Sequence, residues 1–255
     1  MPEQMPIVTA PVGHTTHPAT LRLKTWASQF PQPVQKSEEW KAQRASYCTA
    51  SQHAAAMGRC PYKSRRDALR QYGGVIGTEF TGNIATRHGE AHEDDAVAKY
   101  EKIRNVKVHL FGMVPFLNNS TWLGGSPDGV TSDGILIEVK CPYRRNPNGT
   151  VPAHYMPQIQ SMMHGFNLHV CHFVEYVPAT AWTDEVFHIN EVPRCPKYWE
   201  EALPLLTKFW KDVGTLREGD VQESEPPAAP PPPKRKREPR ATPACIITYG
   251  ARESL

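Results

Sequence analysis

Proline is the residue that most limits what this chain can fold into. Eight of the eighteen residues from Pro226 to Pro243 are proline, and the run Lys234-Arg235-Lys236-Arg237 lies among them. Such a stretch cannot bury enough apolar surface to form a core, so it predicts a disordered, basic tail over residues 221–255. Six prolines in residues 1–36 predict a flexible or surface-lying N-terminal arm. One folded domain is therefore expected over residues 37–220.

Length and composition fit one globular domain. The chain has 255 residues, 39% of them hydrophobic, and a formal net charge of +3. This charge is too small to indicate a nucleic-acid-binding protein, so any attraction to DNA has to come from a local cleft. The six cysteines include no C-x-x-C pair, and no signal sequence or apolar run of about 20 residues occurs. We therefore expect an intracellular protein with reduced thiols and no membrane role.

Hydrophobic periodicity predicts an α/β fold. Helical spacing predicts helices over residues 37–57, with Ser37 as N-cap, over 89–105 after a turn at 86–89, and over 155–166 and 197–216. Runs rich in β-branched residues predict strands over 106–113, 122–124, 135–141 and 170–177. Helices that alternate with strands in this order are typical of an α/β layout.

The strand predicted over residues 135–141 carries the most informative polar side chains. Strand alternation places Leu136, Glu138 and Lys140 on one face of that strand. The preceding turn, Gly125-Ser126-Pro127-Asp128-Gly129, is close enough in sequence for a hairpin to return Asp128 to Glu138. Two carboxylates make a hard oxygen site for Mg²⁺ or Mn²⁺, and a nearby lysine can hold an attacking water. Phosphodiester hydrolysis needs this combination, although each motif alone is common on protein surfaces.

Three motifs in this order resemble a known family. Ser126-Pro127-Asp128-Gly129, Ile137-Glu138-Val139-Lys140-Cys141-Pro142 and Tyr155-Met156-Pro157-Gln158-Ile159-Gln160 resemble the lambda exonuclease, or YqaJ-like, family of viral recombination nucleases, within the PD-(D/E)xK superfamily. The likeness extends upstream to Gly89-Glu90-Ala91-His92-Glu93 and to Trp40-Lys41-Ala42-Gln43-Arg44 followed by Thr49-Ala50-Ser51. It covers roughly residues 40–210. The resemblance implies a restriction-endonuclease-like core, with a central mixed β-sheet flanked by helices.

The resemblance also implies a metal centre. Asp128, Glu138 and the backbone carbonyl of Val139 would ligate one or two Mg²⁺ or Mn²⁺ ions. Glu93 would support the metal shell directly or through water. Lys140 would position or deprotonate the attacking water. Some relatives carry a further acidic residue where this chain has Asn118 and Asn119, so a third acidic contribution from that segment is left open.

Other residues are expected to position the attacking water or to bind DNA. The resemblance implies that Gln158 helps to fix the water and Lys140, and that Arg44 with Ser51 holds a terminal 5′-phosphate. Arginine suits this task because its planar fork matches phosphate oxygens. Arg144 and Arg145 follow the predicted catalytic strand directly, a position from which they can grip the phosphate backbone.

The expected function is a Mg²⁺-dependent exonuclease that digests duplex DNA from 5′ to 3′ and leaves 3′ single-stranded tails for recombination. Family resemblance implies double-stranded DNA ends as substrate, a strand-annealing partner and a ring-shaped homotrimer. The run Lys234-Arg235-Lys236-Arg237 predicts nuclear localisation. Two alternatives remain open: a junction-resolvase-like endonuclease of the same fold, and a non-catalytic nuclear interaction protein that only binds DNA.

Overall fold

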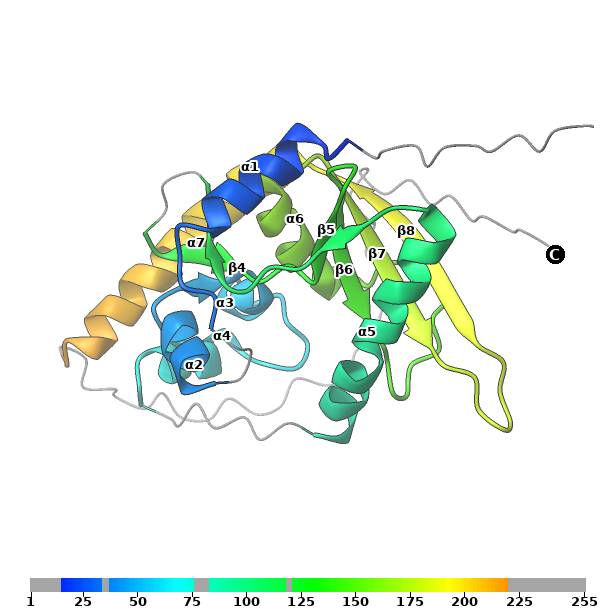
Figure 1. Ribbon diagram of the computed structural model, residues 1–255. Coiled ribbons are helices and arrows are strands. Elements are labelled where there is room, and N and C mark those ends of the chain that lie inside the picture. Colours follow the sequence, from blue (N-terminus) through cyan, green and yellow to red (C-terminus); the bar gives the residue numbers. More distant parts are fainter. Residues whose placement is uncertain (1–14, 34–36, 76–82, 118–120, 220–255) are drawn as a thin grey trace, which may run out of the picture.

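A five-stranded mixed sheet forms the centre of the protein. The computed structural model describes residues 15–33, 37–75, 83–117 and 121–219. The sheet has the order β2 (Val108–His109), β5 (Gly129–Thr131), β6 (Leu136–Lys140), β7 (Val170–Val177) and β8 (Val186–Pro193). Only β6 and β7 run parallel; the other three pairs are antiparallel. A second sheet contains β1 (Cys48–Thr49), β4 (Leu123–Gly125) and β3 (Val114–Pro115) (Figure 1).

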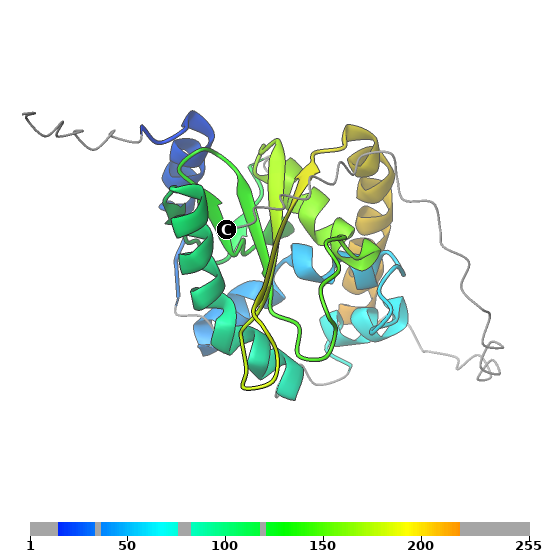
Figure 2. The same cartoon turned by 90° about the vertical axis from the view of Figure 1, so that its right-hand side faces the viewer.

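Helices cover both faces of the larger sheet. Helix α5 (Ile84–Arg104) lies on one side, and α6 (Met156–Gly165) and α7 (Pro196–Arg217) lie on the other (Figure 2). On the α5 side, Ala96 and Tyr100 belong to a buried cluster with Ile137 and Val139. On the α6 side, Leu136 of β6 joins the larger core. A central strand covered on both faces is buried along most of its length, as is usual in layered α/β folds. This is the expected fold class.

The remaining helices are short. They are α1 (Pro18–Ala27), α2 (Glu38–Ala45), η1 (Ala50–Gln52), α3 (His53–Ala56), α4 (Arg65–Tyr72) and η2 (Ala153–Tyr155). Helix α4 packs on α7, and α3 packs on α6. In the part of the chain that the structure describes, no helix combines the length and apolar character needed to cross a bilayer.

Residues 18–27 differ from the predicted arm because they form helix α1. Pro18 stands at the start of the helix, where its missing N–H costs nothing. Leu23 is fully buried, and Trp26 donates from Nε1 to the carbonyl of Pro115 at 2.8 Å. Proline therefore begins a docked helix here instead of interrupting one. Residues 1–14 and the tail from 220 onward, with the run Lys234–Arg237, lie outside the described residues.

The helix predicted over residues 37–57 is interrupted after Ala45 and resumes only at η1 and α3. Ser37 does cap the helix, accepting from the Trp40 N–H at 3.1 Å. Cys48 and Thr49, however, form β1, and the Cys48 N–H donates to the Trp122 carbonyl at 2.7 Å. A strand that pairs with β4, 75 residues away in register, overrides the local helical pattern.

Other element boundaries also shift. Helix α5 begins at Ile84, not near Gly89, because Asn83 caps it by accepting from the Thr86 N–H at 3.0 Å. The strand predicted over 106–113 shortens to β2, and β5, which begins at the last residue of the predicted turn 125–129, was not predicted. Strand β8 was missed. Strand β7 has the predicted bounds, and α6 and α7 lie within a residue or so of their predicted ends.

Candidate active site

Asp128 and Glu138 lie side by side at the β5–β6 hairpin. The antiparallel register pairs Gly129 with Ile137, so the residues just outside that pair, Asp128 and Glu138, are neighbours. The carboxylate of Asp128 accepts the backbone N–H of Val139 through Oδ2 at 2.7 Å. The sequence-based expectation that a hairpin returns Asp128 to Glu138 therefore matches the geometry. Three of the predicted site residues meet at this point.

The Glu138 carboxylate is fully buried and uses both oxygens. Oε1 accepts from Nζ of Lys140, two residues along β6, and Oε2 accepts from Nε2 of Gln158 at 2.8 Å. Gln158 reaches the strand from α6. The Lys140 ammonium also lies 5.3 Å from the centre of the Tyr155 ring. Gln158 was expected at the site; Tyr155 was quoted only as part of a motif and its contact with Lys140 was not foreseen.

Burial and mutual repulsion raise the pKa values of the three carboxyl groups at this site. Burial raises the pKa of Glu138 to about 8, with a contribution from Asp128, although Lys140 opposes the shift. The pKa of Glu93, on α5, rises to about 7, first through burial and then through Asp128. Burial also raises the pKa of Asp128, against Lys140 and the Val139 N–H. Three acids that influence one another in this way occupy one electrostatic site.

Lys140 is the cation that partly balances these acids. Burial acts to lower its pKa, but Glu138 and Asp128 outweigh burial and raise the pKa of Lys140. The side chain is therefore held as an ammonium. A protonated lysine can orient a water and stabilise negative charge, but it cannot take a proton from that water.

The donor chemistry of this cluster fits a hard divalent cation. Asp128, Glu138 and Glu93 supply carboxyl oxygens in a partly buried place where the ionised groups repel one another, and one ammonium does not balance three ionised carboxylates. Within the described ranges, no three His, Cys, Asp or Glu side chains already surround a point in ligand geometry. At Glu138, both carboxylate oxygens already accept hydrogen bonds, one from Lys140 and one from Gln158.

A second polar site surrounds Arg44 on α2. Nη2 of Arg44 donates to Oγ of Ser51 at 3.1 Å, so the structure brings the predicted pair together. The guanidinium carbon lies 4.6 Å from the Trp40 ring centre. Burial lowers the pKa of Arg44, and no carboxylate in the described chain forms a salt bridge with it. A partly desolvated guanidinium without an acidic partner suits an anion such as phosphate.

Two further residues complete the Arg44 site. Thr49 Oγ1 lies 3.3 Å from the Ser51 hydroxyl, and the Thr49 N–H donates to the Tyr72 hydroxyl at 3.2 Å. Thr49 stands in the motif quoted above, so its spacing of two residues from Ser51 was a usable signal. Tyr72 comes from α4, and no local pattern identifies it.

The two arginines after β6 differ in their surroundings. Arg144 is exposed, and its guanidinium carbon lies 5.9 Å from the Tyr143 ring centre. Arg145 is ion-paired with Glu175, a fully buried residue of β7 that the sequence analysis missed. Asn118, Asn119 and the basic run 234–237 lie outside the described residues.

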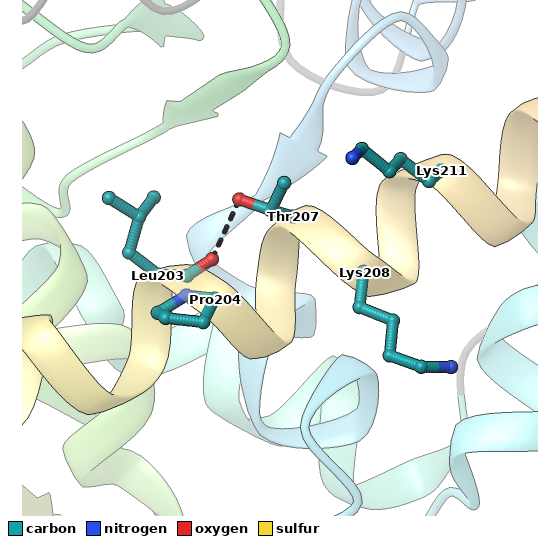
Figure 3. A pocket seen from close by; sticks show the side chains of 5 residues that line it. All are labelled: Leu203, Pro204, Thr207, Lys208 and Lys211. Atoms are coloured by element: carbon teal, nitrogen blue, oxygen red, sulfur yellow. Dashed lines mark hydrogen bonds between the residues drawn. The ribbon is translucent and has the colours of Figure 1, made fainter.

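An open hollow on α7 involves none of these residues. It is lined by Leu203, Pro204, Thr207, Lys208 and Lys211, and Thr207 Oγ1 donates to the Leu203 carbonyl at 2.8 Å (Figure 3). All of its walls come from one helix. The hollow therefore contains none of the predicted site residues.

A protein-family model and a viral relative both match parts of this chain. Residues 39–166 match the family model for the YqaJ-like viral recombinase domain. An uncharacterised protein of Acanthamoeba polyphaga mimivirus, R354, is 27% identical over 165 residues, which are 58% of this chain and 30% of that protein. The chain thus spans less than a third of the length of this relative.

Solved structures share the fold. The alkaline exonuclease LHK-Exo from Laribacter hongkongensis superposes with a TM-score of 0.62 at 25% identity, over 72% of this chain and 95% of the exonuclease. Its complex with dAMP gives a TM-score of 0.63 over the same shares. A phage-related exonuclease from Haemophilus somnus 129PT, at 12% identity and a TM-score of 0.53, covers 69% of this chain and 96% of its own, and is similar in fold alone.

Proposed function

The chain belongs to the YqaJ-like viral recombinase family, and from this membership we propose that it is a metal-dependent DNA exonuclease. It digests one strand of duplex DNA from the 5′ end and leaves a 3′ single-stranded tail for recombination. The observation that carries the proposal is the cluster at β6, in which Asp128 accepts the Val139 N–H and the fully buried Glu138 accepts from Lys140 and Gln158. The similarity to an alkaline exonuclease at 25% identity supports it.

Asp128, Glu138, Glu93 and the Val139 carbonyl would hold Mg²⁺ or Mn²⁺, as one or two ions. When bound, the metal supplies positive charge to the attacked phosphate and lowers the pKa of a water. These residues fit because oxygen ligands are the ones that such hard cations prefer.

The chain's own side chains position the reactants. Glu138 and Asp128 raise the pKa of Lys140, and its ammonium would donate hydrogen bonds to the attacking water or to the phosphate oxygens as their charge grows. Gln158, on helix α6, donates a hydrogen bond that holds the Glu138 carboxylate in place. Because Glu138 is fully buried, these electrostatic interactions are weakened little by solvent.

The Arg44 site accounts for the choice of DNA end. A 5′-phosphate fits a guanidinium flanked by the Ser51 and Thr49 hydroxyls, which can each donate to an oxygen. Exposed Arg144 and half-exposed Arg145 would bind the phosphate backbone nearby.

The partners follow from the same proposal. Duplex DNA ends are the substrate, a single-strand annealing protein takes up the 3′ tail, and a homotrimeric ring around DNA gives processivity. The basic run Lys234–Arg237 would direct the protein to a nucleus.

Digestion of labelled DNA tests the activity. Linear duplex labelled at either 5′ or 3′ end is incubated with Mg²⁺, beside closed circular DNA and a four-way junction. Loss of the 5′ label as mononucleotides, with the circle intact, is expected. Equal cutting of the circle or of the junction would favour the endonuclease alternative. Wild-type function in Glu138→Ala would favour the non-catalytic alternative.

A further inference from the structure

Glu175 is a fully buried carboxylate at the same edge of the sheet as Lys140. It lies on β7, where the parallel register pairs it directly with Lys140 of β6. Side chains at paired positions leave a sheet on the same face, so Glu175 is directed to the side that carries Glu138 and Lys140. A carboxylate buried there without a partner would be costly.

Arg145 is the partner that balances Glu175. Its Nη2 donates to Oε1 of Glu175, while the arginine side chain remains 35% exposed. A buried ion pair adds little net stability compared with apolar residues, because desolvation offsets the attraction. The pair does, however, determine where the guanidinium stands. It holds Arg145 at the rim of the site, partly open to solvent.

Two nearby polar atoms have no partner among the described residues. Oε2 of Glu175 and Nε2 of His154 are both buried and form no hydrogen bond. The free carboxylate oxygen can accept a second N–H from the planar guanidinium fork. Burial, followed by Arg145 and Lys140, lowers the pKa of His154, so this imidazole does not compete as a cation for Glu175.

We propose that Glu175 is a positioning residue that holds the Arg145 guanidinium beside Lys140, where its outward N–H groups bind a phosphate of the digested strand. The inference rests on the proposed nuclease function. One edge of the guanidinium faces Glu175, and its five N–H groups leave others for phosphate oxygens. Glu175 therefore acts on DNA only through Arg145.

Three variants test this role: Glu175→Gln, Arg145→Met and the two combined. DNA binding is measured by fluorescence anisotropy without metal over a range of salt, and cleavage by steady-state kinetics. We expect KM to rise about tenfold in each variant with kcat changed less than about threefold. The slope of log affinity against log salt should fall by about one phosphate contact. The double variant should be no worse than Arg145→Met, because the two residues act as one unit.

Arg194→Gln is the matched control. Arg194 bonds Asn167 near the opposite edge of the sheet, beyond the end of β8, so its loss should leave KM and the salt slope unchanged. If a single variant fails to fold, the double variant decides, since it removes both charges at similar volume. A purely structural pair would lower Tm while KM and slope stay at wild-type values, and that result overturns the proposal. Wild-type protein that binds but does not cleave DNA contradicts the proposed function, whereas the metal-free binding slopes still test Glu175.

Discussion

The backbone N–H of Val139 donates to the Asp128 carboxylate at 2.7 Å, which ties the Ser-Pro-Asp-Gly turn to the middle of strand β6. This bond makes the turn and the strand one unit. Asp128 also raises the pKa values of Glu138 and Glu93, so the bond fixes a residue that acts on both of these carboxyl groups.

Asp128→Asn should abolish cleavage while keeping the fold. The amide oxygen can still accept the Val139 N–H, but the negative charge that attracts the metal is lost. We expect cleavage to fall by about 100-fold or more, with Tm close to wild type. Asp128→Ala also removes the hydrogen bond and should cost about 1 kcal/mol of stability. Cleavage kinetics and thermal unfolding measure the two effects. Full activity in Asp128→Asn would contradict the metal-ligand role.

Lys140→Ala should separate catalysis from DNA binding. Loss of the ammonium removes the group that positions water and balances Glu138, so cleavage should become nearly undetectable. Binding of duplex DNA, measured by anisotropy, should change by less than about threefold because other cations hold the backbone. Lys208→Ala, at a 73% exposed lysine of α7, is the control and should cleave normally. Equal losses of binding and cleavage would argue against a catalytic role for Lys140.

Metal affinity should rise with pH. The raised pKa values, about 8 for Glu138 and about 7 for Glu93, mean that these carboxyls carry protons near neutrality, and a divalent ion has to displace them. Binding should therefore release protons, and affinity should increase until both groups are ionised. We expect calorimetry with Mn²⁺ to give an affinity about tenfold higher at pH 8.5 than at pH 6.5. A flat profile, or the same profile in Glu138→Gln, would exclude Glu138 as the titrating ligand.

His53 should make the folded protein sensitive to acid. Burial lowers the pKa of His53 to about 4, against its bond to the Cys48 carbonyl, whereas the unfolded-state value is about 6.5. The unfolded chain binds the extra proton, so stability is complete above pH 6.5 and is lost as pH falls towards 4. The loss should reach about 2 kcal/mol at pH 5. Urea unfolding at pH 7 and pH 5 measures it.

The matched variant for this prediction is His53→Gln. It is less stable at pH 7, since it alters the bonds to Cys48 and Ser161, but its stability should depend less on pH. An identical drop between pH 7 and pH 5 in both proteins would assign the acid sensitivity to other groups.

Arg44→Lys should remove the preference for 5′-phosphorylated ends. Lysine keeps the charge but lacks the planar fork that matches phosphate oxygens. The ratio of cleavage rates on phosphorylated and unphosphorylated ends should fall by about tenfold. Arg22→Lys, on α1, is the control and should keep the wild-type ratio. An unchanged ratio in Arg44→Lys would place phosphate recognition elsewhere.

Local pattern was enough for part of the site. Alternation along residues 136–140 placed Glu138 and Lys140 on one face, and the turn residues around Asp128 predicted a return to that face. Strand β7 and helices α6 and α7 were predicted nearly to their ends, since β7 and α6 are buried along most of their length and α7 buries residues at helical spacing. These features could be predicted because side chains return to the same face every three to four residues along a helix and every two residues along a strand.

Tertiary structure decided what comes together across long separations. Pairing with β4 made a strand of Cys48 and Thr49, and packing against the sheet made a helix of the segment that begins at Pro18. The Tyr72 contact with Thr49 and the Arg145 pair with Glu175 are likewise absent from any local pattern. The sequence alone determined which chemical groups the protein carries and which face of β6 presents them. Their neighbours were decided by the packing of α2, α4, α5 and β7, because burial and long-range pairing outweigh local preference.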